Sequence, residues 1–322
     1  MIWKPTLGES LRLMLAVGLA LGPAGCAADA TAPDAAVEPD AGASPEAGVD
    51  HADGGRRDSK PVVFVEPAWV KVAAGDFGMG SPTSEACRRE DEDQHQVTIS
   101  RAFDLGETEV TQEQFQSLMG YNPSFQTACG VQCPVDWVSW HEAAAYCNAL
   151  SAAKGLPTCY ACTGSGAAVT CDPPAGSKLL DCTGFRLPTE AEFEHAARAG
   201  TTTALPNGAI ASCMSSDPNA DKIAWYKVNS TGLPRPVRGK AANAWGLYDL
   251  TGNAYEWVSD WYQPHLGTAP LTDPVGPTTG GQRVFRGGAW YFNAEHLRPA
   301  HRLAFAPTKR FTFLGFRCAR TR

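Results

Sequence analysis

Ten of the eleven cysteines in this 322-residue chain lie between Cys87 and Cys318, and the remaining one, Cys26, stands far from them. An even number of cysteines in a folded region is typical of proteins that mature in an oxidising compartment, where up to five disulfides could form here. The chain also contains 32 glycines and 24 prolines, and long helical periodicity is absent. These features favour a cross-linked, loop-rich fold over a helical bundle.

The first 26 residues have the pattern of a secretory signal. Lys4 and Arg12 precede an apolar run over residues 13–21, which is too short to cross a bilayer comfortably, and small residues follow up to Cys26. The Ala-Gly-Cys ending resembles a bacterial lipobox, in which the cysteine is lipidated and becomes the mature N-terminus. We expect an exported, lipid-anchored protein of the bacterial cell envelope, in the outer membrane or the periplasm, with ordinary secretion as the alternative.

Residues 27–60 form a linker rich in Ala, Asp, Pro, Glu and Gly. The segment has no aromatic residue, no Leu or Ile, and only two valines, so it cannot bury enough apolar surface to fold. From residue 62 to 322 no second linker and no internal repeat is found, which predicts one folded domain. The net charge of −7 gives no support to a nucleic-acid partner, because such a partner requires a basic surface.

Three segments of the domain are predicted to be helices. Each starts with a Ser or Thr cap followed three positions later by Glu or Gln, and each is followed by a glycine: TQEQFQSLMG, SWHEAAAYCNALSAAKG and TEAEFEHAARAG. Short strands are expected over residues 69–72 and 77–79 around a turn, and over 95–100, which we expect to pair with 103–109. No helix is expected after Gly200, so the predicted class is α+β with much irregular structure.

Seven segments, taken in order, resemble the formylglycine-generating enzyme, or sulfatase-modifying-factor, domain. They are FGMGS (77–81), ETEVTQEQF (107–115), CPVDWVSWHEAAAYC (133–147), GFRLPTEAEFEHAARAG (184–200), NAWGLYDLTGNAYEWVSDWY (243–262), VFRGGAW (284–290) and LGFRC (314–318). The resemblance implies a single C-type-lectin-like domain over roughly residues 67–320. The family contains generators that oxidise a sulfatase cysteine with copper and oxygen, sulfoxide synthases, and exported proteins without known activity.

The segment after the double glycine decides against the copper chemistry of the generators. The resemblance places Ala289 at the position of their serine and Phe292 at that of their first copper-binding cysteine, and the second falls near His296 or Leu297. No cysteine lies between Cys213 and Cys318, so a pair of thiolates for Cu(I) is missing. We therefore expect no copper and no catalytic residue.

Two other possible sources of chemistry are interpreted as structural. His296 and His301 could be metal ligands, and Glu295 is adjacent. The histidine pair alone, however, supplies two ligands, one fewer than most catalytic metal sites use, so the two are interpreted as polar histidines on a loop. Glu190 and Glu192 fall in the first turn of a predicted helix, where capping and the helix dipole explain them. The sulfoxide synthases need histidines from an N-terminal helical domain, whereas this chain has a linker there.

The resemblance also implies a disulfide between Cys147 and Cys318, which match a bridged pair of the family. Such a bridge closes a loop of about 170 residues and would stabilise the fold by about 4–5 kcal/mol on the chain-entropy model. For the other cysteines we expect bridges Cys129–Cys133, Cys159–Cys182 and Cys162–Cys171, with Cys87 and Cys213 left to pair. A zinc site in the segment that begins with Cys159 is the alternative.

The segment DLTGNAYEW matches positions that bind structural calcium in the family. Carried over by position, the ligands are the carboxylates of Asp249 and Glu256 and the backbone carbonyls of Gly252 and Ala254. Calcium prefers several oxygen ligands from a tightly turned loop, and glycine permits such a turn. A turn without an ion is the alternative. Six tryptophans are expected to pack in the core: Trp137, Trp140, Trp245, Trp257, Trp261 and Trp290.

The function we expect is that of a non-catalytic binding or scaffold module, tethered to the membrane by an N-terminal lipid. Its partner would be a protein, a peptide or a glycan of the cell envelope, held in a groove lined by Trp290, Tyr291, Phe292, Arg298 and Arg302. For the same five residues, core packing and internal ion pairs are the alternative. The alternative functions are an oxidoreductase of the formylglycine-generating type with altered metal ligands, acting on an exported protein, and a structural envelope protein.

Overall fold

The structure is a computed structural model that describes residues 64–173 and 179–322. The predicted signal, Cys26 and the linker over 27–60 lie outside the described residues. In the part that is described, no helix has both the length and the apolar character needed to cross a membrane.

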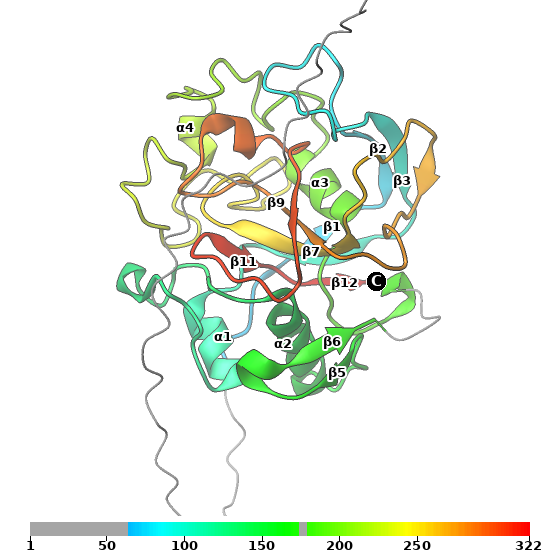
Figure 1. The fold of residues 1–322 in the computed structure, drawn as a ribbon, viewed down its shortest axis with the longest axis vertical. Helices are drawn as coiled ribbons and strands as arrows, with labels where there is room; N and C mark the ends of the chain where they lie inside the picture. The colour runs from blue at the N-terminus through cyan, green and yellow to red at the C-terminus, as the bar shows by residue number, and fades with distance from the viewer. Residues whose placement is uncertain (1–63, 174–178) are drawn as a thin grey trace, which may run out of the picture. The chain divides into compact units, whose positions relative to one another are not determined.

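Short strands form three small sheets and one hairpin (Figure 1). The central sheet has the order β10-β9-β7-β11, in which β11 runs parallel to β7 and the other pairs are antiparallel. Its strands are β7 (Tyr255–Trp261), β9 (Arg283–Arg286), β10 (Leu303–Phe305) and β11 (Leu314–Phe316). In this sheet β7, which follows the segment with the candidate calcium ligands, pairs with β9, which leads into the double glycine.

The two other sheets each have three strands. The sheet β1-β4-β12 consists of Trp69–Val72, Phe103–Gly106 and Ala319–Thr321, so it brings the two ends of the domain together. The sheet β2-β3-β8 consists of Gly75–Met79, His95–Ile99 and Leu271–Thr272, and a separate hairpin pairs β5 (Ala161–Thr163) with β6 (Thr170–Asp172). The expected pairing of residues 95–100 with 103–109 was wrong, because β3 pairs with β2 and β4 pairs with β1. Residues 75 and 76, expected in a turn, begin β2.

The three predicted helices are present, and each begins with the expected reciprocal cap. They are α1 (Gln112–Met119), α2 (Trp140–Ala153) and α3 (Glu190–Arg198), with capping boxes Thr111/Gln114, Ser139/Glu142 and Thr189/Glu192. One further short helix, α4 (Ala220–Ile223), was not expected. The predicted α+β class with much irregular structure is confirmed.

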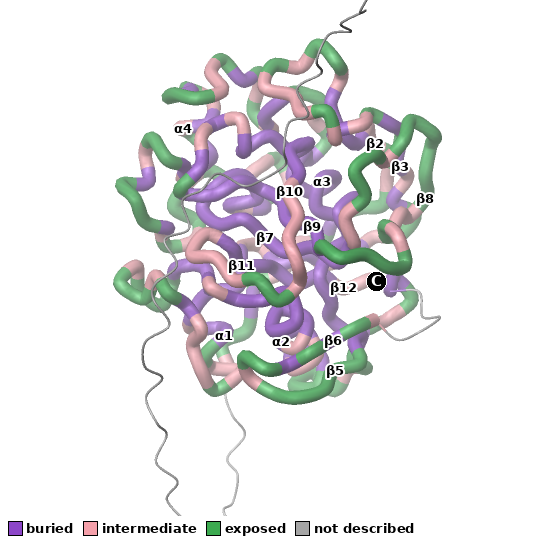
Figure 2. Tube along the Cα trace, viewed as in Figure 1, coloured by how far each residue is buried: buried purple, intermediate pink, exposed green. Residues whose placement is uncertain are grey.

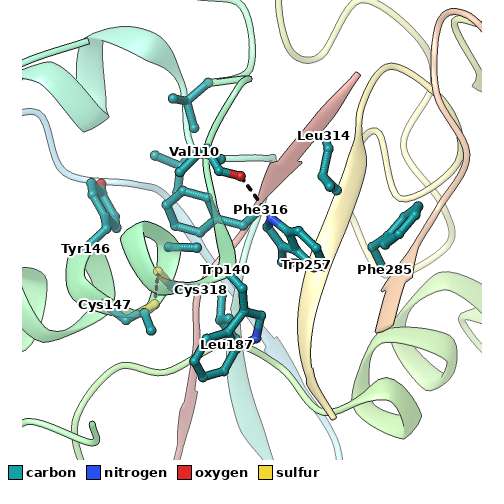
Figure 3. Packing of buried hydrophobic residues seen from close by; sticks show 14 of the residues in the cluster. Val110, Trp140, Tyr146, Cys147, Leu187, Trp257, Phe285, Leu314, Phe316 and Cys318 are labelled. Atoms are coloured by element: carbon teal, nitrogen blue, oxygen red, sulfur yellow. Dashed lines mark hydrogen bonds between the residues drawn. The ribbon is translucent and has the colours of Figure 1, made fainter. Parts of the chain in front are cut away.

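Helices α1 and α2 pack with the central sheet around a core of aromatic side chains (Figure 3). Trp140 and Trp257 are fully buried there, and each indole N–H donates to a backbone carbonyl, of Val258 and Val138 respectively. Trp290 is also buried, whereas Trp137, Trp245 and Trp261 are half-buried, so the core holds three of the six expected tryptophans completely. In Figure 2 the strands β7, β9 and β11 are buried along nearly their whole length.

All nine residues of α3 are buried, although five of them carry ionisable side chains. Each carboxylate of this helix meets an arginine: Glu192 pairs with Arg186, Glu194 with Arg198 and Arg286, and Glu190 with Arg286 and Arg302. The core around α3 therefore consists of ion pairs as well as apolar contacts. The expected capping role is found for Glu192, which completes the capping box of α3. Both Glu190 and Glu192 also accept hydrogen bonds from buried arginines.

Four disulfides cross-link the loops, in the pairs Cys87–Cys213, Cys129–Cys133, Cys159–Cys182 and Cys162–Cys171. Cys147 of α2 and Cys318 are both buried and lie side by side, with their sulfur atoms 2.8 Å apart (Figure 3). The bond expected between them is not formed in this structure, and the disulfide stays a prediction. Burial, together with its neighbour Cys147, raises the pKa of Cys318 well above its ordinary value.

Candidate functional site

The segment after β9 turns sharply into the interior of the domain. Gly287 and Gly288 have positive φ angles of 100° and 76°, and a Cβ atom on Gly288 would lie 2.7 Å from the carbonyl oxygen of His296. The turn places Ala289 and Phe292 in the core, where they are 0% and 5% exposed. The two positions that the resemblance matches to a serine and a cysteine of the generators are therefore occupied by buried hydrocarbon side chains.

Of the five residues expected to line a groove, Tyr291 alone is exposed. Trp290 is buried with its indole N–H donating to the carbonyl of Thr312, and Phe292 packs against Tyr255 and Phe313. Trp290 and Phe292 thus both pack against other segments of the domain instead of facing solvent. The expected groove is therefore reduced to a surface centred on Tyr291.

The expectation that Arg298 and Arg302 line the groove was wrong. Both are buried, and both are held by carboxylates: Arg298 donates two hydrogen bonds to Glu92 at 2.6 and 2.7 Å, and Arg302 donates two to Glu190 at 2.6 and 2.9 Å. Since both guanidinium groups are buried and paired with carboxylates, neither is presented to a ligand on the surface. Their role is to connect distant loops.

A polar cluster that sequence reasoning missed lies below the Tyr291 surface. The hydroxyl of Tyr255 lies 2.8 Å from Nδ1 of His296 and 3.5 Å from Nδ1 of His301, and the two imidazole rings are 4.5 Å apart. Burial lowers the pKa of His301 well below its ordinary value, and burial raises that of Tyr255, so both are neutral at neutral pH. The spacing of the two histidines was visible in the sequence, but Tyr255 is 41 residues away from His296 and gave no signal.

The Tyr255 cluster does not amount to a catalytic metal centre. Two imidazole nitrogens are one ligand fewer than most catalytic sites use. Within residues 64–173 and 179–322, no group of three or more His, Cys, Asp or Glu side chains is arranged to hold a metal ion. The cluster is best described as a buried hydrogen-bonded support for the loop that carries Tyr291.

A second buried cluster contains the expected calcium ligands. Glu256 of β7 is held by Arg317 through two hydrogen bonds of 2.6 and 2.7 Å, so its carboxylate is already engaged. Asp249 accepts from the backbone N–H of Arg238 through Oδ2, but its buried Oδ1 has no hydrogen-bond partner in the part of the chain that the structure describes. The same holds for both buried carboxylate oxygens of Glu109, a residue that was not predicted. Glu109 stands in the ETEVTQEQF segment, which the sequence had marked without assigning it a role.

The charges of this carboxylate cluster do not balance. The three carboxylates of Glu109, Asp249 and Glu256 outnumber the guanidinium groups of Arg317 and Arg238 that act on them, and Arg238 is shared with Glu107. Burial raises the pKa of Glu109, and the charges of Asp249 and Glu256 raise it further; burial also raises the pKa of Asp249 to about 6. Three unpartnered oxygens in a negative site fit a hard divalent cation, provided that backbone carbonyls complete its shell.

The sequence of this chain matches a known domain family and several named proteins. The domain described as "Sulfatase-modifying factor enzyme 1-like domain" matches residues 57–322. The protein named "Chaperone protein LppX" of Paenibacillus barcinonensis is 32% identical over 222 residues, which cover 60% of this chain and 71% of that protein.

The enzymes of the family are covered less completely. The formylglycine-generating enzyme of Mus musculus is 31% identical over 199 residues, which cover 58% of this chain and 44% of that enzyme. Among solved structures, Treponema denticola variable protein 1 aligns with a TM-score of 0.68 at 33% identity, covering 81% of this chain and 97% of that one. The match to the enzyme thus spans less than half of its length, while the match to the variable protein spans nearly all of it.

Proposed function

This chain belongs to the sulfatase-modifying factor enzyme 1-like domain family, and we propose that it is a non-catalytic member that binds a protein segment in the cell envelope. The observation that carries the proposal is the buried hydrocarbon of Ala289 and Phe292 at the two reactive positions. Ala289 and Phe292 offer neither a hydroxyl nor a thiol, so the two positions cannot supply the thiolate ligand that Cu(I) prefers. Copper is therefore not part of the proposed function.

The binding surface is the loop face, which we define as residues 125–137, 227–238 and 290–293. These three segments are joined by backbone hydrogen bonds, from Lys227 to Phe292 at 2.9 Å and from Val237 to Gln132 at 3.1 Å. The loop face carries five exposed large hydrophobic side chains: Phe125, Val131, Val228, Leu233 and Tyr291. Apolar side chains gathered on rigid, cross-linked loops are typical of an interaction surface.

The charge of the loop face favours one class of partner. Residues 225–240 contain four basic side chains and no acidic one, although the whole chain has a net charge of −7. Arg238 is paired with Glu107, whereas Lys227 is exposed. A partner that places apolar side chains on Tyr291 and acidic ones near Lys227 matches both features. We therefore infer a protein or peptide segment rather than a neutral glycan.

The loop face is tested by selecting peptides from a random library on the oxidised domain. We expect enriched peptides with apolar and acidic residues, and at least a tenfold weaker Kd for Tyr291→Ala, because aromatic side chains dominate such interfaces. Leu271→Ala is the matched control, since Leu271 is 39% exposed and Tyr291 is 37% exposed, but Leu271 lies on β8. The proposal would be contradicted if the selected peptides bound Tyr291→Ala as tightly as the unchanged domain. It would also be contradicted if the domain bound glycans on an array and no peptide was enriched.

The proposal includes export and a lipid anchor at Cys26, supported by the signal-like first 26 residues and the linker over 27–60. We expect the full chain, expressed in a bacterium that processes lipoproteins, to incorporate an alkynyl fatty acid, and Cys26→Ser to abolish the label. Ala30→Ser, which leaves the cysteine intact, should label normally. A label that persists in Cys26→Ser, or that is absent from the unchanged chain, would rule out this anchor.

Calcium is proposed as a structural ion of the carboxylate cluster. The residues that would hold it are Asp249 and Glu109 through carboxylate oxygens, with Gly252 and Ala254 through carbonyls as expected from the resemblance. Glu256 would contribute less than expected, because Arg317 occupies its carboxylate. The ion would neutralise the excess negative charge and fix the loop that leads into β7.

A further inference from the structure

Asp136 is a buried acid of the loop face, and among residues 64–173 and 179–322 it forms no ion pair with a basic side chain. Its side chain is bound by backbone instead. Oδ1 accepts from the N–H of Phe125 at 2.8 Å, and Oδ2 accepts from the N–H of Gln126 at 3.1 Å. Hydrogen bonds to an ionised carboxylate are about twice as strong as those to a neutral acceptor, so these two bonds depend on the charge of Asp136.

The bonds to Asp136 fix the position of Phe125. Phe125 is 54% exposed, more than any of the other four large hydrophobic side chains of the loop face. Its N–H to Asp136 is the only hydrogen bond that Phe125 forms in the part of the chain that the structure describes. The Phe125 ring lies beside that of Trp137, with 5.9 Å between the ring centres. Asp136 and the residue after it therefore hold the most exposed aromatic side chain of the surface.

The backbone that carries Asp136 is itself anchored to other segments. The N–H of Val135 donates to the carbonyl of Val110 at 2.8 Å, and the N–H of Trp137 donates to that of Phe311 at 3.0 Å. Val110 and Val135 are both buried in the aromatic core. A change in the carboxylate therefore acts on the turn that it holds rather than on the core behind it.

Burial and the two bound N–H groups set the charge of Asp136. Burial raises its pKa, the N–H groups of Phe125 and Gln126 lower it, and the resulting value is about 7. This value lies above the unfolded pKa of about 3.9, so the folded protein binds the proton more tightly than the unfolded chain does. The stability that this proton contributes is complete below pH 4 and is lost as the pH rises through about 7. Proton uptake below pH 7 thus changes the turn without unfolding the domain.

Charged side chains on the segments around Asp136 are bound elsewhere. Glu113 of α1 accepts from the side chain of Gln132, and Arg310, next to Phe311, pairs with Glu142 at 2.9 Å. None of these charges contributes to the pKa of Asp136, whose shift arises from burial and from backbone groups. The proton on this carboxyl therefore has no competing partner among the described residues.

We propose that Asp136 is a positioning residue of the loop face, whose ionised carboxylate holds Phe125 in place for the partner peptide, so that uptake of one proton weakens peptide binding. The neutral carboxyl is a weaker acceptor for the two N–H groups, and it carries a donor of its own. The turn must then be ordered when the peptide binds, which lowers the affinity. This inference rests on the proposed function, because it names the regulation of the same surface.

The test measures the Kd of one selected peptide without histidine between pH 5.5 and 8.5, on the oxidised protein. We expect binding about fivefold weaker at pH 5.5 than at pH 8.5, with a midpoint near pH 7. Asp136→Asn should bind weakly at every pH, since the amide carries no charge and does not titrate. Asp217→Asn is the matched control: Asp217 also accepts from backbone N–H groups, but these hold its pKa below its ordinary value, so the pH dependence should remain.

A second measurement needs neither a peptide nor a variant, and so it decides if Asp136→Asn fails to fold. In protein labelled with ¹⁵N-phenylalanine, the amide signal of Phe125 should shift with pH around 7, because its N–H is bound to the titrating carboxylate. The amide of Phe115, which donates to the carbonyl of Thr111 inside α1, should not shift in this range.

The outcomes separate this inference from the proposed function. If the loop face selects no peptide, the proposed function and its regulation are overturned together. If peptides bind through Tyr291 with the same Kd at every pH, the regulation alone is overturned. An unchanged pH dependence in Asp136→Asn would assign the effect to another group, such as His296 below Tyr291, and would also overturn it. A Phe125 amide that does not titrate between pH 5.5 and 8.5 would do the same.

Discussion

Replacing Arg286 with methionine is expected to lower the free energy of unfolding by about 3–5 kcal/mol, because it leaves buried carboxylates without one of their partners. Arg286 ends β9 and donates to Glu190 at 3.0 Å, to Glu194, and to the carbonyl of Ala300 at 3.3 Å. All of these groups are buried, so water cannot replace the lost bonds. Methionine keeps much of the volume, so the loss reports the charges rather than a cavity.

The destabilisation by Arg286→Met should also depend on pH with a defined sign. Burial alone would raise the pKa of Glu190, but Arg302 and Arg286 together hold it below its ordinary value. A carboxyl with a lowered pKa stabilises the folded state above its unfolded pKa of about 4.3, and this contribution is lost as the pH falls through the folded value. The difference between Arg286→Met and the unchanged protein should therefore be largest near pH 7 and shrink below about pH 4.

Arg322→Met is the control for this experiment. Arg322 pairs with Asp104 at 2.7 Å, but its side chain is 51% exposed, so its removal should cost less than about 1 kcal/mol. Urea denaturation with equal m-values for the three proteins measures both differences. If the free energy of unfolding falls no more in Arg286→Met than in Arg322→Met, the arginine–glutamate pairs around α3 contribute little to stability. Another explanation for their burial would then be needed.

The parts of the fold that were predicted correctly depend on neighbours in the sequence. The starts of α1, α2 and α3 were assigned correctly because a capping box is complete within four residues. Strand pairing is a different matter, since β4 could pair with β3 or with β1 on the basis of pattern alone. The isolated pattern of a strand fixes its alternation but not its partner.

The interior of the site could not be predicted for the same reason. Glu190 meets Arg286 and Arg302 across 96 and 112 residues, and no spacing rule connects them. Arginines of the segment RVFRGGAWYFNAEHLRPAHR therefore suggested a ligand surface, whereas most of them are bound inside the domain. Tyr255 and Glu109 were missed because each becomes notable only through the groups that the fold places beside it.

Removal of calcium is expected to lower the free energy of unfolding by about 3–4 kcal/mol, when an excess of EGTA is compared with calcium at several hundred times its Kd. Without the ion, the carboxylates of Glu109, Asp249 and Glu256 outnumber the guanidinium groups of Arg317 and Arg238, and three buried oxygens of Glu109 and Asp249 have no partner among residues 64–173 and 179–322. The ion relieves both penalties in the folded state and gains nothing in the unfolded chain. Elemental analysis of the oxidised domain should find one calcium ion per chain and neither copper nor iron.

Variants of the carboxylate cluster separate a bound ion from a general effect of the chelator. Glu109→Gln and Asp249→Asn should each lose most of the response to calcium, since each removes a charged ligand from the site. Asp136→Asn should keep it, because Asp136 is also a buried acid but accepts from the backbone of Phe125 and Gln126 in another loop. If all three variants respond as the unchanged protein does, the ion binds elsewhere. Because an ion at Asp249 would change neither Ala289 nor Phe292, bound calcium is compatible with a binding module, whereas stoichiometric copper or iron would favour the oxidoreductase alternative.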